Sequence, residues 1–153
     1  MLTNISKRRL SAALTLMLSG RAMTLLFLAD VGGGGPGDPP SAWLMPLVGD
    51  AIIGVLAPLV AWWTLRARTP GAWAAVLGFH AVAIWDACAA FLVHTSVPWP
   101  SFFMVEIFGS SMFVMASLMH LVAAGLLVGA DVRPSFGHDA WAPAVAGKTR
   151  PAR

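Results

Sequence analysis

Charged residues are scarce in this sequence. Lysine, arginine, aspartate and glutamate together make up 11% of the 153 residues, whereas 58% are hydrophobic. A soluble domain contains about 25% charged residues, because its surface must face water. This chain has too few charges to cover such a surface. The composition therefore excludes a soluble globular domain and predicts that a lipid bilayer covers most of the protein.

The motifs of common enzyme and metal sites are also missing. The one cysteine, Cys88, lies within an apolar run, so the chain cannot form an internal disulfide. No CxxC or zinc-ligand pattern occurs, and the glycine run at 32–35 lacks the following Lys and Ser/Thr of a phosphate-binding loop. The sequence leaves open whether the protein is an enzyme, and we expect no resident cofactor from these patterns.

Four apolar runs are long enough to cross a bilayer as helices. A spanning helix needs about 20 mostly apolar residues, and an open sheet edge is not tolerated in lipid. These runs predict an all-α fold, a polytopic four-helix transmembrane bundle within residues 1–130. In the second run, Gly49, Gly54 and Pro58 predict a close helix contact or a kink. The runs occupy residues 10–29, 42–65, 72–93 and 102–128.

The segments between and after these runs have a different composition. The stretch VGGGGPGDPPS at 31–41 is rich in helix breakers and predicts a flexible loop. The stretch RARTPG at 66–71 predicts a tight basic turn. The basic, proline-containing tail at 131–153 predicts a poorly ordered segment.

Basic residues mark one side of the predicted membrane domain. The positive-inside rule places basic loops in the cytoplasm, so both termini and the 66–71 turn are predicted to be cytoplasmic. Flanking basic residues of this kind are not a nucleic-acid-binding surface. Arg21 interrupts the first run, which argues against a cleaved signal peptide, and the richness in Ala, Gly, Pro and Arg favours a bacterial inner membrane. The basic residues outside the runs are Lys7, Arg8, Arg9, Arg66, Arg68, Arg133, Lys148, Arg150 and Arg153.

Three charged residues inside the runs are predicted to meet in one layer. At a rise of 1.5 Å per residue, Arg21, Asp50 and Asp86 lie about 18, 24 and 22 Å above the cytoplasmic helix ends. A charge at the centre of a membrane helix costs about 2.5–3.5 kcal/mol on insertion scales. Pairing Arg21 with one or both carboxylates removes most of that cost. The layer is either a structural ion-pair network or a functional site.

Histidines form two further predicted pairs. His80 and His120 each lie about 13 Å from the cytoplasmic edge of facing helices, so their imidazoles can point at each other. One interpretation is hydrogen bonding to backbone or serine. The other is axial ligation of a haem b, which takes one imidazole from each of two helices. His94 and Glu106 are predicted to lie at matching height near the periplasmic ends of the same helices.

The leading functional hypothesis is a buried polar site. Arg21, Asp50 and Asp86, with His80 and Glu106 nearby, would bind a small or lipophilic ligand or pass protons, and the less well paired aspartate would titrate. One alternative is a b-type electron carrier ligated by His80 and His120. Another is an accessory subunit without chemistry that packs on a larger membrane complex. Transport by so short a chain would require a homo-oligomer.

The overall plan of four apolar helices with few charges resembles that of two groups of small membrane proteins, the DoxX-like proteins and the sterol-isomerase-like EXPERA group. The resemblance covers topology alone, and no residue of this sequence takes a role from it. It implies a four-helix membrane fold. In the EXPERA group, buried acidic residues bind or protonate a lipophilic amine or sterol.

Overall fold

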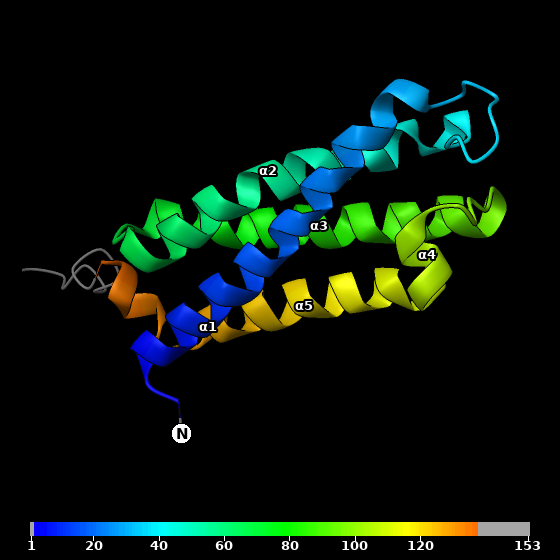
Figure 1. Ribbon diagram of the computed structural model, residues 1–153. Helices are drawn as coiled ribbons and strands as arrows, with labels where there is room; N and C mark the ends of the chain where they lie inside the picture. The colour runs from blue at the N-terminus through cyan, green and yellow to red at the C-terminus, as the bar shows by residue number, and fades with distance from the viewer. Residues whose placement is uncertain (1, 138–153) are drawn as a thin grey trace, which may run out of the picture.

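Four long apolar helices dominate the computed structural model, which describes residues 2–137 (Figure 1). No strand occurs among these residues. The four helices that are long and apolar enough to cross a membrane span Asn4–Asp30, Ser41–Arg66, Pro70–Ser96 and Ser111–Val128. The elements in chain order are α1 (Asn4–Met17), η1 (Leu18–Asp30), η2 (Ser41–Trp43), α2 (Leu44–Arg66), α3 (Pro70–Ser96), α4 (Phe103–Phe108), α5 (Ser111–Val128) and η3 (Arg133–Phe136).

Helices α2, α3 and α5 run lengthwise beside one another, and the first span crosses them at an angle (Figure 1). Its α1 half packs on α5 and α2, whereas its η1 half packs on α2. Threonine side chains cap two helix starts, where the first backbone N–H groups have no partner within the helix. Thr3 accepts from the backbone N–H of Ser6, and Thr69 accepts from that of Ala72, just before the helix-compatible Pro70.

The second half of the first span is a 3₁₀ helix of 13 residues. We expected one continuous helix here, and 3₁₀ runs longer than three or four residues are uncommon. With three residues per turn, side chains three apart line up on one face. Leu18 and Thr24 are accordingly buried, whereas Met23 and Leu26 are 52% and 70% exposed. This register places Arg21 on the inward line, between Leu18 and Thr24.

Two glycines of α2 let neighbouring backbone and side chains come close. A Cβ atom at Gly54 would overlap the backbone of Arg21 and Ala22 in η1. A Cβ atom at Gly49 would overlap the Asp86 carboxylate on α3. The predicted role of these glycines in close helix contact is confirmed. Both of them lie beside the residues of the charged layer.

The prediction of one continuous fourth helix over 102–128 is wrong. The chain breaks at Gly109, whose φ of +56° and ψ of −150° suit glycine alone. The backbone N–H of Gly109 bonds to the carbonyl of Val105 and ends α4, and α5 begins at Ser111. Glu106 therefore lies on a short separate helix.

The first residues after α5 are folded onto the bundle. The prediction of a poorly ordered tail from residue 131 onward does not hold for residues 131–137, because they include the helix η3 and two fully buried side chains. Val132 and Phe136 pack against Val60, Val76 and Leu127 from three different helices. The rest of the predicted tail, 138–153, lies outside the described residues.

Replacing Gly54 by alanine tests the contact between α2 and η1. The added Cβ atom must push the Arg21–Ala22 backbone away, and overpacking of this kind costs about 1–3 kcal/mol. Gly20→Ala is the matched control, because a Cβ atom there meets nothing within 4 Å. Unfolding in detergent, followed by circular dichroism, should show a lower midpoint for Gly54→Ala alone. Equal midpoints for the two variants would contradict the packing described.

Candidate functional site

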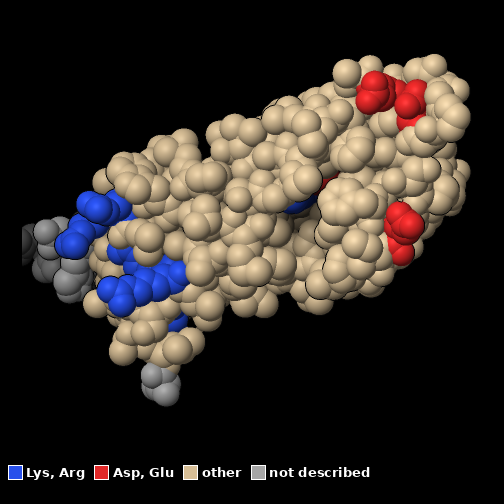
Figure 2. All heavy atoms as spheres, viewed as in Figure 1, with Lys and Arg blue, Asp and Glu red and all other residues tan. Residues whose placement is uncertain are grey.

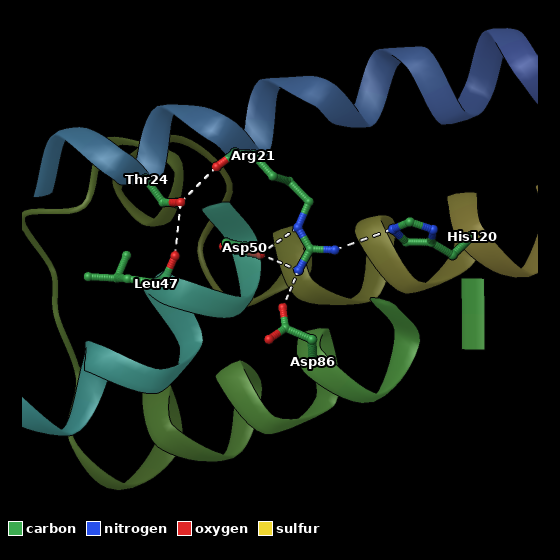
Figure 3. Close-up of polar contacts among 6 residues, drawn as sticks. All are labelled: Arg21, Thr24, Leu47, Asp50, Asp86 and His120. Atoms are coloured by element: carbon green, nitrogen blue, oxygen red, sulfur yellow. Dashed lines mark hydrogen bonds and ion pairs between the residues drawn. The ribbon is translucent and has the colours of Figure 1, made fainter. Parts of the chain in front are cut away.

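The predicted charged layer forms around Arg21, which lies on η1 and reaches between α2 and α3 (Figure 3). Its Nε and Nη2 atoms both contact Oδ1 of Asp50, and Nη2 also donates to Oδ2 of Asp86 at 2.5 Å. The three side chains are only 12%, 16% and 14% exposed, respectively. The prediction that Arg21 pairs with one or both carboxylates is confirmed, since it contacts both. Asp50 receives two contacts and Asp86 receives one.

The charges of this cluster do not cancel. One guanidinium stands against two carboxylates, which leaves a formal excess of one negative charge when both acids are ionised. An uncompensated charge is costly away from water, where the dielectric constant is low. The cluster is therefore suited to take up one proton or one cationic group.

Thr24 fixes the backbone that carries Arg21. Its hydroxyl donates to the carbonyl of Arg21 at 2.7 Å and contacts that of Leu47 on α2 at 3.2 Å (Figure 3). Thr24 lies one 3₁₀ turn after Arg21 and is 3% exposed. Sequence reasoning missed this residue, because its alignment with Arg21 depends on a three-residue period that hydropathy does not reveal.

The predicted histidine pair is also confirmed. The Nδ1 atoms of His80 on α3 and His120 on α5 lie 2.9 Å apart, and both side chains are fully buried. Nη1 of Arg21 lies 3.3 Å from Nε2 of His120 (Figure 3). The ring of Phe79 packs edge-on against both imidazoles. The pair thus joins the charged cluster through the third guanidinium nitrogen.

Hydrogen-bond chemistry assigns a tautomer to each histidine. Arginine only donates, so Nε2 of His120 must accept and its Nδ1 must carry the proton. His120 then donates to Nδ1 of His80, whose proton is on Nε2 and faces the Thr15 hydroxyl at 3.5 Å. Thr15 in turn donates to the carbonyl of Ser11 at 2.8 Å. Both imidazoles are neutral in this hydrogen-bonded arrangement. A second ring proton on His120 would face an arginine N–H, and one on His80 would face the Nδ1 proton of His120.

The close contact of the histidines bears on the haem alternative. Axial ligands lie on opposite faces of a porphyrin, and rings whose nitrogens are 2.9 Å apart leave no space for one between them. Haem binding would require α3 and α5 to move apart. Within residues 2–137, no group of three or more His, Cys, Asp or Glu side chains is placed to hold a metal ion.

No hydrogen bond or ion pair joins His94 to Glu106 among the described residues, although the two were predicted to lie at matching height. His94 packs against the rings of Trp43 and Phe113, with centroids 6.0 and 5.4 Å away. Its buried Nδ1 atom has no hydrogen-bond partner in the described part of the chain. Glu106 is exposed on α4. The break at Gly109 removes Glu106 from the line of α5.

A cavity of about 400 Å³ lies between η1 and the α4–α5 segment, with Arg21 and Asp50 of the charged cluster at its wall. Arg21, Thr24 and Asp50 are its polar lining residues, and the space-filling view shows a hollow with blue and red atoms at its floor (Figure 2). Six of the eight methionines of the chain line it. The apolar lining includes Met17, Met23, Met104, Met112, Met115, Met119, Phe102, Phe103, Phe108 and Phe113.

Comparison of this chain with protein-family models, with curated proteins and with solved structures finds no match. The geometry of the cavity and its polar wall is therefore the basis for a functional assignment. An apolar cavity with a few converging polar groups is the usual form of a small-molecule site.

Nitrogen NMR of the histidine side chains tests the assigned hydrogen-bond chain. In protein labelled with ¹⁵N-histidine, we expect His120 to show a protonated Nδ1 and His80 a protonated Nε2, both neutral near pH 7. His120→Gln identifies the resonances and should change those of His80. Two rings of the same tautomer, or an imidazolium at this pH, would contradict the chain from Arg21 to Thr15.

Proposed function

We propose that this protein binds a lipophilic molecule with a basic amine in the cavity beside Arg21 and Asp50. The observation that carries the proposal is one guanidinium that is paired with two carboxylates, where the guanidinium and the Asp50 carboxylate line an apolar cavity. The cavity supplies a place for a hydrocarbon body. The unbalanced cluster supplies a place for one positive charge.

The lining supports an apolar ligand of variable shape. A cavity of about 400 Å³ falls within the range of about 300–1,000 Å³ that small-molecule sites occupy. Methionine side chains are flexible and polarisable, so a methionine-rich wall adapts to different ligand outlines. Met17 and Met23 line it from the first span, and Met112, Met115 and Met119 line it from α5.

The charge balance supports a cationic head group. In the empty cavity, one carboxyl holds a proton, and Asp86 is the better candidate because it receives a single contact from Arg21. An ammonium group that binds beside Asp50 supplies the positive charge that the proton supplied before. Asp86 therefore releases its proton. Ligand entry is thereby coupled to the loss of about one proton, with no change in the net charge of the site.

The histidine pair has a supporting role in this proposal. His120 holds Nη1 of Arg21 through a neutral acceptor and so adds no charge to the cluster. His80, Thr15 and Ser11 continue the hydrogen-bonded chain toward the start of the first span, and the Ser11 hydroxyl donates to the carbonyl of Ala123 at 2.9 Å. This chain fixes the guanidinium relative to α1, α3 and α5.

We further propose an orientation with both termini in the cytoplasm of a bacterial cell and the bundle in its inner membrane. The separation of charge along the bundle supports this topology (Figure 2). Asp30 at the end of η1, Asp38 in the loop that follows and Glu106 on α4 lie at the opposite end from the basic residues. The basic end, defined here by Lys7, Arg8, Arg9, Arg66, Arg68 and Arg133, would face the cytoplasm under the positive-inside rule.

Two simple observations separate this proposal from the alternatives. A Soret band in purified protein, lost in His80→Ala and His120→Ala, would make it a b-type haem protein. Recovery of the chain only within a larger complex would favour an accessory subunit. A colourless protein that is stable when isolated as a monomer or homo-oligomer agrees with the binding proposal.

A matched set of decylamine, decanol and decanoate tests the ligand class. A ligand that binds the folded state raises the unfolding midpoint by mass action. In mild detergent near pH 7, we expect decylamine to give the largest rise, decanol a small one and decanoate none. Asp50→Asn should remove the preference for the amine. In the unmodified protein, a pH-indicator dye should report release of about one proton per bound amine.

The matched controls vary the cavity without changing charge. Ala116→Phe places a ring in the cavity and should abolish the amine response, whereas Val122→Phe on an exposed face of α5 should retain it. The proposal fails if the three ligands act alike, or if Ala116→Phe responds as the unmodified protein does.

A further inference from the structure

A second hollow lies at the basic end, between the start of α1 and the end of α2. Its volume is about 340 Å³, and it is lined by Ile5, Arg8, Arg9, Leu65 and Arg68. Three of the five lining residues are arginines and none is acidic. It lies at the opposite end of α1 from η1, so it is separate from the cavity beside Arg21 and independent of the function proposed there.

The arginine at the back of this hollow is held in place by neutral groups. Nε and Nη2 of Arg8 donate to the carbonyls of Thr64 and Ala67 at 2.7 and 2.9 Å. The guanidinium also lies 4.1 Å from the ring centroid of Phe136. Carbonyls at a helix C-terminus repel anions, and Arg8 covers two of them at the end of α2. Its own positive charge remains unneutralised by these contacts.

No acidic side chain of the described residues is placed to balance the hollow. Asp131 is at the same end of the bundle, but it accepts a 2.6 Å hydrogen bond from Lys7. That bond lowers the pKa of the Asp131 carboxyl, so Asp131 stays ionised and neutralises Lys7. Arg9 and Arg68 are exposed at the rim. The hollow thus presents a local excess of positive charge.

Apolar side chains adjoin the arginines on the surface that faces lipid. Ile5 and Leu65 line the hollow and are 65% and 49% exposed, and the nearby Trp62 of α2 is 53% exposed. These residues belong to the terminal turns of spans that begin at Asn4 and end at Arg66, so they lie at the level of lipid head groups. Arginine binds phosphate oxygens through two parallel hydrogen bonds. The hollow therefore combines arginine side chains, which suit a phosphate group, with an adjoining apolar surface.

We propose that this hollow binds the phosphate head group of an anionic phospholipid, with the acyl chains against Ile5 and Leu65. Arg9 contacts the phosphate from α1 and Arg68 contacts it from the connector between α2 and α3. Arg8 holds the end of α2 and adds positive charge behind them. A bound lipid thereby joins the start of the first span to the 66–71 turn.

Native mass spectrometry of the full chain in detergent, titrated with phosphatidylglycerol or phosphatidylcholine, tests this proposal. We expect phosphatidylglycerol to be retained preferentially. Arg9→Gln and Arg68→Gln should each weaken its retention at least about tenfold, because each removes charge-assisted bonds to the phosphate. Arg66→Gln is the matched control. It removes the same charge two residues from Arg68 but outside the hollow, so it should cost no more than about fivefold, the effect of general surface attraction.

Three results would overturn the proposal. Equal losses of phosphatidylglycerol retention in Arg66→Gln and Arg68→Gln would mean that the lipid is attracted to the basic end as a whole and not to the hollow. Equal retention of phosphatidylcholine would remove the requirement for an anionic lipid. Displacement of the lipid by glycerol phosphate or inorganic phosphate, at the same concentration at which phosphatidylglycerol saturates the site, would identify a site for soluble phosphate instead. Circular dichroism of each variant confirms that loss of lipid does not reflect loss of fold.

Discussion

The arrangement of the bundle depends on one guanidinium that is shared by two carboxylates. Arg21, Asp50 and Asp86 come from three different elements, η1, α2 and α3, and none of them can face lipid alone without a large cost. Their contacts set the height of these elements relative to one another. His120 occupies the remaining guanidinium nitrogen and brings α5 into the same arrangement.

Backbone geometry is adapted to this cluster. The three-residue period of η1 keeps Leu18, Arg21 and Thr24 on one inward line, and Gly54 lets α2 approach the backbone beside Arg21. The first span packs on both α2 and α5 in its α1 half, but its η1 half packs on α2. The methionine-rich cavity lies in the space between η1 and α5. The same geometry that buries the charges therefore leaves an apolar space beside them.

Sequence reasoning predicted the features that follow from burial cost and helix rise. Hydropathy located four spans, and residue counting placed Arg21 near both aspartates and His80 near His120. It did not predict the 3₁₀ segment or the cavity, because both depend on how helices cross rather than on local composition. It also missed the break at Gly109, which depends on the conformation of that one residue. Glu106, which was predicted to lie level with His94, is on a separate short helix, because one backbone torsion at Gly109 redirects the chain.

A comparison of Arg21→Met with the triple variant Arg21→Met, Asp50→Asn, Asp86→Asn tests the central role of the cluster most directly. Removing Arg21 alone leaves two buried carboxylates without their partner, which should cost about 3–5 kcal/mol of unfolding free energy. Neutralising both acids as well should restore most of that loss, measured by unfolding in the same detergent. A single variant as stable as the unmodified protein, or a triple variant no more stable than the single one, would contradict this account.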